Sequence, residues 1–489
     1  MAGRYAFTVR PLSLRWLGNR TGQGVKSLNA IRISGREALP LVEGGKGIAI
    51  SNGESSGAWA ASGGVGTFSG VNADFTGEDG AMVDQVYNGK SRRDRHEELV
   101  AYAIKGGIHQ AQVAHEISGG NGAIHMNVLW EMGGCERILH GVLEGAKGVV
   151  NGVTCGAGMP YKMAQICAEY GVYYYPIISS ARAFQILWKR AYHRFPEWLG
   201  GVVYEDPWRA GGHNGLSNVE DPQVPEDPYP RVAALRKVMI ACGLDETPIV
   251  MAGGVWRIDE WEHWLDNPEI GPISFQFGTR PLLTQESPIS DTWKRRLPTL
   301  REGEIYLNRF SPTGFYSSAV ENSFLMELKG RNDRQVAYST EEVGDHVVEF
   351  KFGPRGRGVW LTEHDEVHVR DWLAAGFTEP LKTPDSTLVF VTPEKSHQIR
   401  SHQVGCMGCL SQCRFSNWKC DEGGTTGKKP DPRSFCIQKT LQSISHSDDI
   451  ETQLMFAGHN AYRFASDPWY ADGFIPTVAQ LMERLRVGQ

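Results

Sequence analysis

The sequence AGGHNG at positions 210–215 places His213 directly after Gly211 and Gly212. Two glycines leave room for a flat ligand, and an imidazole that titrates near neutral pH can act as a general base. A lone histidine is more often structural than catalytic. The glycine-rich setting favours a catalytic role for His213, provided that this loop lies at the functional end of its domain.

Two further glycine-rich segments have the composition of a phosphate site. They are AGG at positions 252–254 and QFGT at positions 276–279. Glycine allows backbone N–H groups to approach an anion closely, and a following helix N-terminus adds a favourable dipole. The alternative is that both segments are tight turns without a ligand, because such turns favour glycine in any case.

Five of the nine cysteines lie between positions 406 and 436, and they suggest a metal centre. Cys406, Cys409 and Cys413 have the spacing C-x2-C-x3-C, and Cys420 and Cys436 follow. Four thiolates can hold a [4Fe–4S] cluster or a structural zinc ion. Both metals and a site without metal stay open, and Cys436 is preferred to Cys420 as the fourth ligand.

The elements that must position these residues alternate along the first half of the chain. Short apolar runs are separated by helix-like stretches, which is the pattern of βαβ units and a parallel sheet. The runs are LPLVEGG, GVGTFSG, AIHMNVLW, GVVNGVTCG, YYYPIIS, GGVVYED, PIVMAGG and ISFQFGT. Eight strands, each followed by a helix, predict an α/β fold, a (β/α)8 barrel, with a doubly wound open sheet as the alternative.

In such a barrel the loops after the seventh and eighth strands often bind phosphate, and both glycine-rich segments fall there. A charged and then apolar stretch at 88–122 predicts an extra helix or two over one end of the barrel, and 212–230 predicts a long loop. Beyond the barrel, HVVEFKF and STLVFVT predict short strands of an α+β region, and PTVAQLMERL predicts a last helix with Pro476 near its first turn. The predicted division is an N-terminal arm (1–30), the barrel (31–290), an α+β accessory region (291–400), a Cys-rich metal-binding segment (401–445) and a C-terminal helical segment (446–489).

Composition narrows the class of partner. The chain has 489 residues and a formal net charge of -6, without a basic stripe, so nucleic acid is not an expected partner. It has no run of 18 apolar residues and no signal-like start, so we expect neither a membrane span nor export. The expected location is therefore cytoplasmic, and a homodimer is the expected assembly.

The order of several motifs resembles the nitronate monooxygenase family, also known as 2-nitropropane dioxygenases. These motifs are LVEGGKG, ASGGVGTFSG, HMNV, TCGAGMP, AGGHNG, MAGGV and QFGTRPLLTQES, and they span about half the chain. The resemblance implies an FMN-dependent barrel enzyme that oxidises a nitroalkane or nitronate with O2. In such enzymes a base removes the acidic proton beside the nitro group, and the flavin carries the redox chemistry.

The resemblance also implies roles for individual residues. His213 matches the catalytic base. The residues that match the flavin-binding positions are Gly44, Gly45 and Lys46 on the first strand, Asn127 on the third, Gly211 and Gly212 beside the flavin ring, and Gly253, Gly254, Gln276, Phe277, Gly278 and Thr279 at the phosphate end.

Three departures put the substrate in doubt more than the cofactor. Arg209 replaces the usual acidic residue before AGGH, the preceding loop is longer, and Lys46 stands where the family has another residue. Lys46 could stabilise an anionic flavin or point into solvent. The segment VGCMGCLSQC resembles the cluster-binding segment of flavin barrels related to 2,4-dienoyl-CoA reductase.

Two alternative functions follow from these features. One is an NAD(P)H-dependent flavin reductase that acts on an enoyl or quinone-like acceptor, which an iron–sulfur cluster would favour because such clusters move single electrons. The other is a non-catalytic subunit that binds flavin or metal, for which the 291–400 region would form an interface.

Overall fold

The computed structural model describes residues 28–353, 355–420 and 424–489, so most of the predicted N-terminal arm lies outside the described residues. Eight parallel strands close into a barrel in the order β10-β11-β3-β4-β5-β6-β7-β8. All eight predicted runs supply these strands, and closure excludes the doubly wound open sheet. The barrel strands are β3 (Leu41–Glu43), β4 (Val65–Ser69), β5 (Ala123–Leu129), β6 (Gly152–Gly156), β7 (Tyr173–Ile178), β8 (Val202–Glu205), β10 (Ile249–Ala252) and β11 (Ile273–Phe277).

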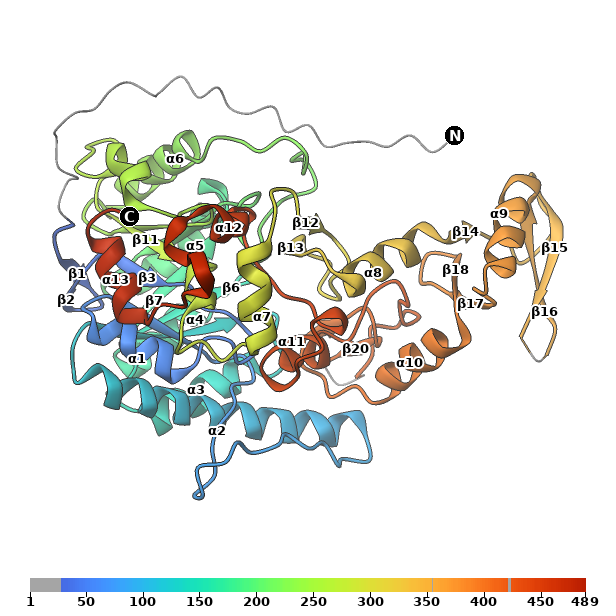
Figure 1. Cartoon of the computed structure of the whole chain (residues 1–489), viewed down its shortest axis with the longest axis horizontal. Helices are drawn as coiled ribbons and strands as arrows, with labels where there is room; N and C mark the ends of the chain where they lie inside the picture. Colours follow the sequence, from blue (N-terminus) through green and yellow to red (C-terminus); the bar gives the residue numbers. More distant parts are fainter. Residues whose placement is uncertain (1–27, 354, 421–423) are drawn as a thin grey trace.

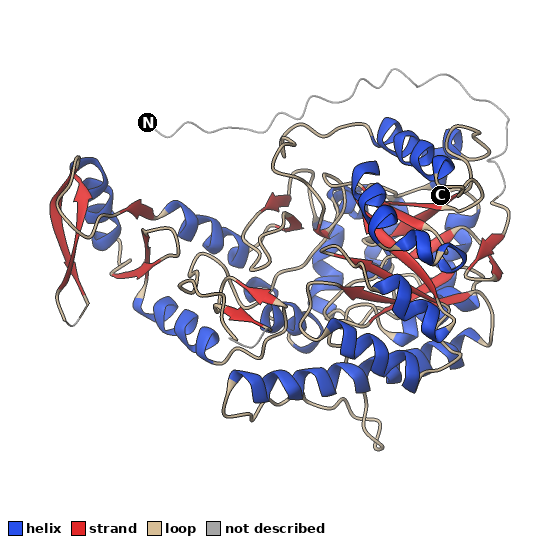
Figure 2. Cartoon of the chain, turned by 180° about the vertical axis from the view of Figure 1, so that it is seen from behind, coloured by secondary structure: helices blue, strands red, loops and turns tan. Residues whose placement is uncertain are grey.

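Helices surround this barrel (Figures 1 and 2), as the βα alternation predicts. Their bounds are α1 (Gly53–Ala61), α2 (Arg92–Ser118), α3 (Cys135–Gly145), α4 (Met163–Tyr170), α5 (Ala181–Arg190) and α6 (Pro228–Ala241). The prediction of an extra helix or two at 88–122 is wrong, because this stretch forms the single long helix α2, which packs against α1 and α3 in the ring.

The last two strands are not followed by α-helices, which corrects the prediction of a helix after every strand. Short 3-10 helices stand there instead, namely η3 (Ile258–Trp264) and η4 (Arg280–Leu283). Prolines explain the shortness, because Pro268 follows η3 and Pro281 lies within η4, and a proline cannot donate the backbone hydrogen bond of a helix interior. The C-terminal helix α13 (Val478–Arg486) contacts α1 and so adds to the ring.

The N-terminal end of the barrel is closed by the antiparallel hairpin of β1 (Ile31–Ile33) and β2 (Arg36–Ala38). The buried Ser34 in its turn has its Oγ 2.8 Å from Nε2 of His125 and 2.7 Å from the hydroxyl of Tyr175. His125 belongs to β5 and Tyr175 to β7, so polar contacts hold the turn of the hairpin against the barrel strands. The cavity described below opens at the opposite, C-terminal end.

The chain beyond the barrel forms a lobe that extends away from it (Figure 1). The lobe contains α8 (Ser323–Asp333), β14 (Gln335–Ala337), β15 (His346–Phe352), β16 (Arg357–Thr362), α9 (Glu363–Ala374), β17 (Glu379–Lys382), β18 (Thr387–Val391) and α10 (Pro393–Val404). Strands β14, β18 and β17 form one antiparallel sheet, and β15 and β16 form a hairpin. A separate hydrophobic core, which includes Val359, Leu388 and Phe390, holds the lobe together.

The remaining short elements connect or cover these parts. They are β9 (Gly212–His213), α7 (Asp291–Arg296), β12 (Ile305–Asn308), β13 (Ser317–Val320), β19 (Gln412–Cys413), β20 (Trp418–Lys419), α11 (Ile437–His446), α12 (Arg463–Ser466) and the 3-10 helices η1 (Tyr192–Arg194), η2 (Pro196–Trp198), η5 (Leu297–Thr299), η6 (Ile450–Thr452), η7 (His459–Tyr462) and η8 (Pro468–Gly473). Pro476 lies outside the last helix, which Thr477 caps through a reciprocal pair of hydrogen bonds with Gln480.

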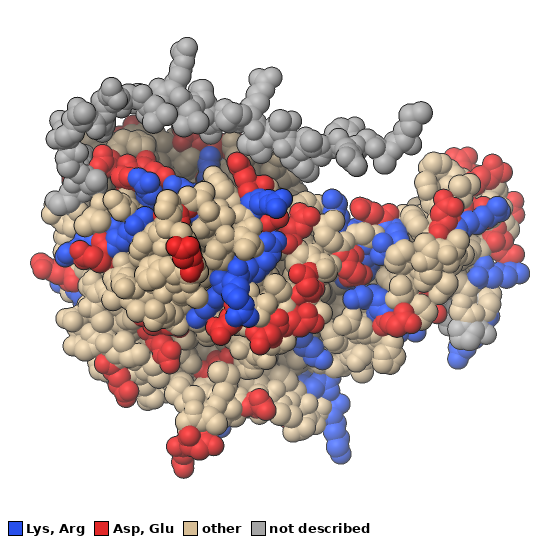
Figure 3. Space-filling model, viewed as in Figure 1, with Lys and Arg blue, Asp and Glu red and all other residues tan. Residues whose placement is uncertain are grey.

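Acidic and basic side chains are interspersed over the face of the molecule seen in Figure 3. Among the described residues, no helix combines the length and the apolar character that crossing a membrane requires.

Candidate functional site

A cavity of about 310 Å³ opens at the C-terminal end of the barrel, where the ends of the strands meet. This volume falls at the lower end of the range for small-molecule sites. The cavity brings together nearly all the residues predicted for cofactor and catalysis. Those that line it are Gly44, Gly45, Lys46, Asn127, Gly211, Gly212, His213, Gly253, Gly254, Gln276, Gly278 and Thr279.

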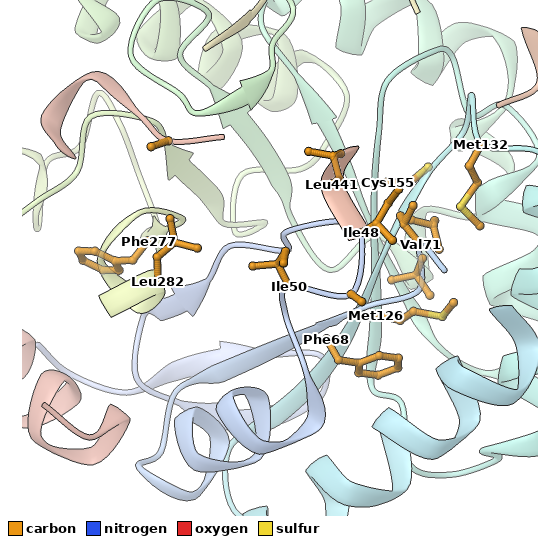
Figure 4. Close-up of a cluster of buried hydrophobic side chains, with 14 of the residues drawn as sticks. Ile48, Ile50, Phe68, Val71, Met126, Met132, Cys155, Phe277, Leu282 and Leu441 are labelled. Atoms are coloured by element: carbon orange, nitrogen blue, oxygen red, sulfur yellow. The ribbon is translucent and has the colours of Figure 1, made fainter. Parts of the chain in front are cut away.

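Phe277 is the exception among the predicted residues, because its side chain does not line the cavity. It lies in the core between the barrel and its helices, with its ring 6.2 Å from that of Trp59 (Figure 4). Successive side chains of a strand point to opposite faces, so Gln276 faces inward and Phe277 outward. The Phe277 backbone still borders the mouth, since its carbonyl accepts a hydrogen bond from the N–H of Gly44 at 2.9 Å.

Several glycines are required at the cavity because neighbouring atoms leave no room for a side chain. A Cβ atom at Gly45 would lie 2.2 Å from Cβ of Asn127, and one at Gly211 would lie 2.5 Å from the carbonyl carbon of Ala457. Gly253 and Gly254 adopt φ angles of +88° and +82°, a region that side chains disfavour. The cavity wall is therefore built largely of exposed backbone.

Lys46 has a partner that the sequence did not indicate. Its Nζ lies 3.2 Å from Oε1 of Glu43 and donates to the carbonyl of Gly44 at 2.8 Å. Glu43 is fully buried and also accepts a hydrogen bond from Ser55. Lys46 thus neutralises a buried carboxylate at the cavity wall and does not extend into solvent.

His213 lies on β9, a two-residue strand that pairs with β13. Its Nε2 is 2.6 Å from Oγ of Ser311, and its ring meets the ring of Phe456 edge-on with 5.3 Å between the centroids. Burial lowers the pKa of His213 to about 4. The imidazole is therefore neutral near pH 7 and held in a defined orientation.

The loop after β8, the sixth barrel strand, explains the arginine at position 209. Oδ2 of the buried Asp206 lies 2.6 Å from Nη1 of Arg209, and Oδ1 accepts from the backbone N–H groups of Trp208 and Arg209. The preceding residue, Glu205, lines the cavity, and burial raises its pKa to about 8, with a further rise from Asp206. Sequence reasoning missed Glu205, although two acidic residues at the end of a barrel strand are a signal for function.

The C-terminal part of the chain supplies a wall of the cavity that the sequence did not predict. Residues 455–457 run beside β13, and Gly458 donates its N–H to Oγ1 of Thr279 at 2.9 Å. Asn460 donates from Nδ2 to the carbonyl of Gly254 at 2.6 Å. The motif LMFAGHN was the available signal, because its glycine and asparagine suit close backbone contact.

The cysteine segment forms another part of this wall. Cys409, Leu410 and Gln438 line the cavity, and Cys406, Cys409, Cys413 and Cys436 are all buried free thiols. Cys420 is only half-buried and directs its Sγ to the carbonyl of Leu410 at 3.6 Å. Within the part of the chain that the structure describes, no three His, Cys, Asp or Glu side chains are arranged to hold a metal ion. Neither the iron–sulfur nor the zinc alternative therefore finds a preformed site among these residues.

Comparisons with known proteins give structural likeness alone. No protein-family model and no curated protein matches the sequence. Similar solved structures include FabK from Thermotoga maritima (12% identity, 95% of this chain and 95% of that chain, TM-score 0.46). A second is a nitroalkane oxidase from Streptomyces ansochromogenes (14% identity, 92% of this chain and 95% of that chain, TM-score 0.47). A third is the enoyl reductase domain of MlnA from Bacillus amyloliquefaciens (12% identity, 92% of this chain and 93% of that chain, TM-score 0.49). The assignment of the fold rests on the strand order of the chain itself.

Glu205 predicts a pH-dependent stability. Because its pKa rises from 4.5 to about 8 on folding, the stabilisation present below pH 4.5 is lost as the pH rises through 8. Glu205→Gln carries no charge at either pH, so its urea midpoint should match the parent's at about pH 5 and exceed it at about pH 8.5. The exposed Glu246→Gln is the control and should change neither midpoint. An equal shift of the Glu205→Gln midpoint at both pH values would contradict the assignment.

Proposed function

We propose that the chain is an FMN-dependent oxidoreductase that oxidises a nitroalkane or its nitronate with O2. The observation that supports this most strongly is the cavity at the barrel mouth, which joins glycine backbone from several strand ends to a neutral, oriented histidine. The order of motifs that resembles nitronate monooxygenases supports the same function, and the residues carrying that resemblance line one cavity.

The residues present fit FMN. Gly45 and Gly211 line the cavity. The buried amide Nδ2 of Asn214 has no partner within the described residues, so it can donate to a ligand carbonyl. The loops after β10 and β11 would hold the phosphate through Gly254 and Gly278, where a Cβ atom at Gly278 would meet open space. When bound, FMN supplies the electron-accepting chemistry that protein side chains lack.

His213 would remove the proton from the carbon beside the nitro group. A neutral imidazole can accept a proton, and its lowered pKa keeps it neutral across the physiological range. If Nε2 donates to Ser311, then Nδ1 is the basic nitrogen. Ser311 in turn lies 2.8 Å from Oγ1 of Thr313, so a short hydroxyl chain would hold the ring in place.

One observation favours the reductase as a second candidate. The buried thiol of Cys409 lines the cavity, and a simple reaction with O2 needs no second redox group there. In this alternative NAD(P)H would donate electrons that pass to an enoyl or quinone-like acceptor. The two candidates share the FMN site and differ in whether His213 must take a carbon-bound proton.

His213→Asn separates proton removal from the rest of the reaction. The variant should retain FMN and lose about 10²- to 10⁴-fold in turnover of a neutral nitroalkane, the usual contribution of a general base. A preformed nitronate has already lost its proton and serves as the internal control, so activity on it should persist. Equal turnover of the neutral nitroalkane by variant and parent would rule out His213 as the base.

Gly278→Asp tests where the phosphate binds. The carboxylate would repel the phosphate at short range, so the affinity for FMN should fall about 10- to 100-fold. Riboflavin lacks the phosphate, and its affinity should stay unchanged. Gly278→Asn has nearly the size of Gly278→Asp without its charge, so it should lose less affinity for FMN. An equal loss for FMN and riboflavin in Gly278→Asp would place the phosphate elsewhere.

A further inference from the structure

Glu205 is the one carboxyl group that lines the cavity among the described residues, and the function proposed above does not use it. Four other ionisable side chains line the same cavity, namely Lys46, Arg209, His213 and Cys409. An unused ionisable group in a binding cavity is a candidate for a role in recognition or catalysis. The contacts of these groups determine what Glu205 can do there.

Both basic side chains of the cavity already have a carboxylate partner. Nζ of Lys46 lies 3.2 Å from Oε1 of Glu43. Nη1 of Arg209 lies 2.6 Å from Oδ2 of Asp206. The carboxyl group of Glu205 has no hydrogen bond or ion pair within the described residues, so no cation balances a charge on it.

The strand register places Glu205 on the inward face of the barrel among apolar side chains. Val203, two residues earlier on β8, belongs to the hydrophobic cluster inside the barrel, and residues two apart share one face of a strand. On β10 the residue opposite Glu205 is Ala252, and on β7 the residue opposite Val203 is Ile177. Ala252 and Ile177 also line the cavity. Burial among such side chains disfavours a charged carboxylate.

The loop after Glu205 connects it to His213 through a turn that internal hydrogen bonds hold in place. Oδ1 of Asp206 accepts from the backbone N–H groups of Trp208 and Arg209, each at 2.9 Å. Strand β8 ends at Glu205, and β9 ends at His213. The carboxyl group and the imidazole therefore stand at the two ends of one braced connection, and both line the cavity.

The surroundings of these groups move their pKa values apart. Burial, with a contribution from the charge of Asp206, raises the pKa of Glu205 to about 8. Burial lowers the pKa of His213 to about 4 and raises that of Cys409 well above its usual range. At pH 7 the cavity therefore presents a neutral base and a neutral acid. Titratable groups with pKa values separated in this way are typical of acid–base pairs in active sites.

We propose that Glu205 keeps its proton at neutral pH and donates a hydrogen bond from its carboxyl group to a negatively charged oxygen of the ligand. This inference rests on the proposed function, because a nitronate is a planar anion with two oxygen atoms on one nitrogen. A protonated carboxyl group is a strong donor to such an oxygen, whereas a carboxylate would repel it. While His213 would take the proton from carbon, Glu205 would keep its own proton and stabilise the charge that develops on the nitro oxygens.

Binding of butyrate at different pH values tests this hydrogen bond. Butyrate is a planar anion with two oxygens, it stays ionised near and above neutral pH, and it has no nitro group to react. For the chain incubated with FMN, the Kd for butyrate measured by calorimetry should rise about tenfold between about pH 7 and pH 9, because binding at the higher pH requires Glu205 to regain its proton. Titrations in two buffers of different ionisation enthalpy should also show uptake from solvent of roughly three quarters of a proton per butyrate at about pH 8.5, and little at about pH 6.5.

Two variants assign the pH dependence to one residue. Glu205→Gln has nearly the parent's size and donates through an amide that does not ionise, so its Kd for butyrate should be the same at both pH values. The exposed Glu246→Gln is the matched control and should keep the tenfold rise. Urea midpoints establish that both variants are folded, and the proton uptake of the parent needs no variant. A rise that survives in Glu205→Gln, or a parent Kd that does not change with pH, would overturn the proposal.

Nitroalkane turnover on the same preparations separates this proposal from the proposed function. Butyrate binding that weakens with pH in the expected way, without nitroalkane turnover, supports the role of Glu205 and counts against nitroalkane oxidation. Turnover together with pH-independent butyrate binding supports the proposed function and overturns the role of Glu205. Absence of butyrate binding at both pH values would also overturn the hydrogen bond.

Discussion

Closure of the parallel barrel is the constraint on which the rest of the structure depends. The last strand, β11, pairs with the first, β3, in the register Phe275 with Leu41, and the N–H of Gly44 extends this ladder to the carbonyl of Phe277. Because all eight strands are parallel, closure brings their C-terminal ends to one rim. Residues from widely separated positions, such as Gly44 and Gly278, then become neighbours.

Residues from the second half of the chain complete the wall of the cavity at the barrel mouth. Leu441 of α11 belongs to the same hydrophobic cluster as Ile48, Ile50 and Val71 from the loops after β3 and β4 (Figure 4). This apolar contact places α11, and with it Cys436, against the barrel mouth. Packing in this region therefore determines the shape of the cavity.

The barrel and the residues on its rim could be predicted because they are local in sequence. Each strand is a buried apolar run, and glycines at the strand ends indicate the tight turns that surround a ligand. The outward direction of the Phe277 side chain could not be predicted, because the motif marks a position along the chain and not the face to which a side chain points. The place of the wall at 455–460 depends on long-range packing, which the motif LMFAGHN does not by itself reveal. The pairing of Lys46 with Glu43 is similar, since no pattern in the sequence indicates that Glu43 is fully buried.

The central claim is that the cavity at the barrel mouth binds a flavin, and an absorption spectrum of the purified chain tests it most directly. The account predicts the two visible bands of oxidised flavin, either as purified or after incubation with FMN and removal of the excess by gel filtration. A chain that is folded by circular dichroism but shows no flavin bands after this treatment would contradict the account.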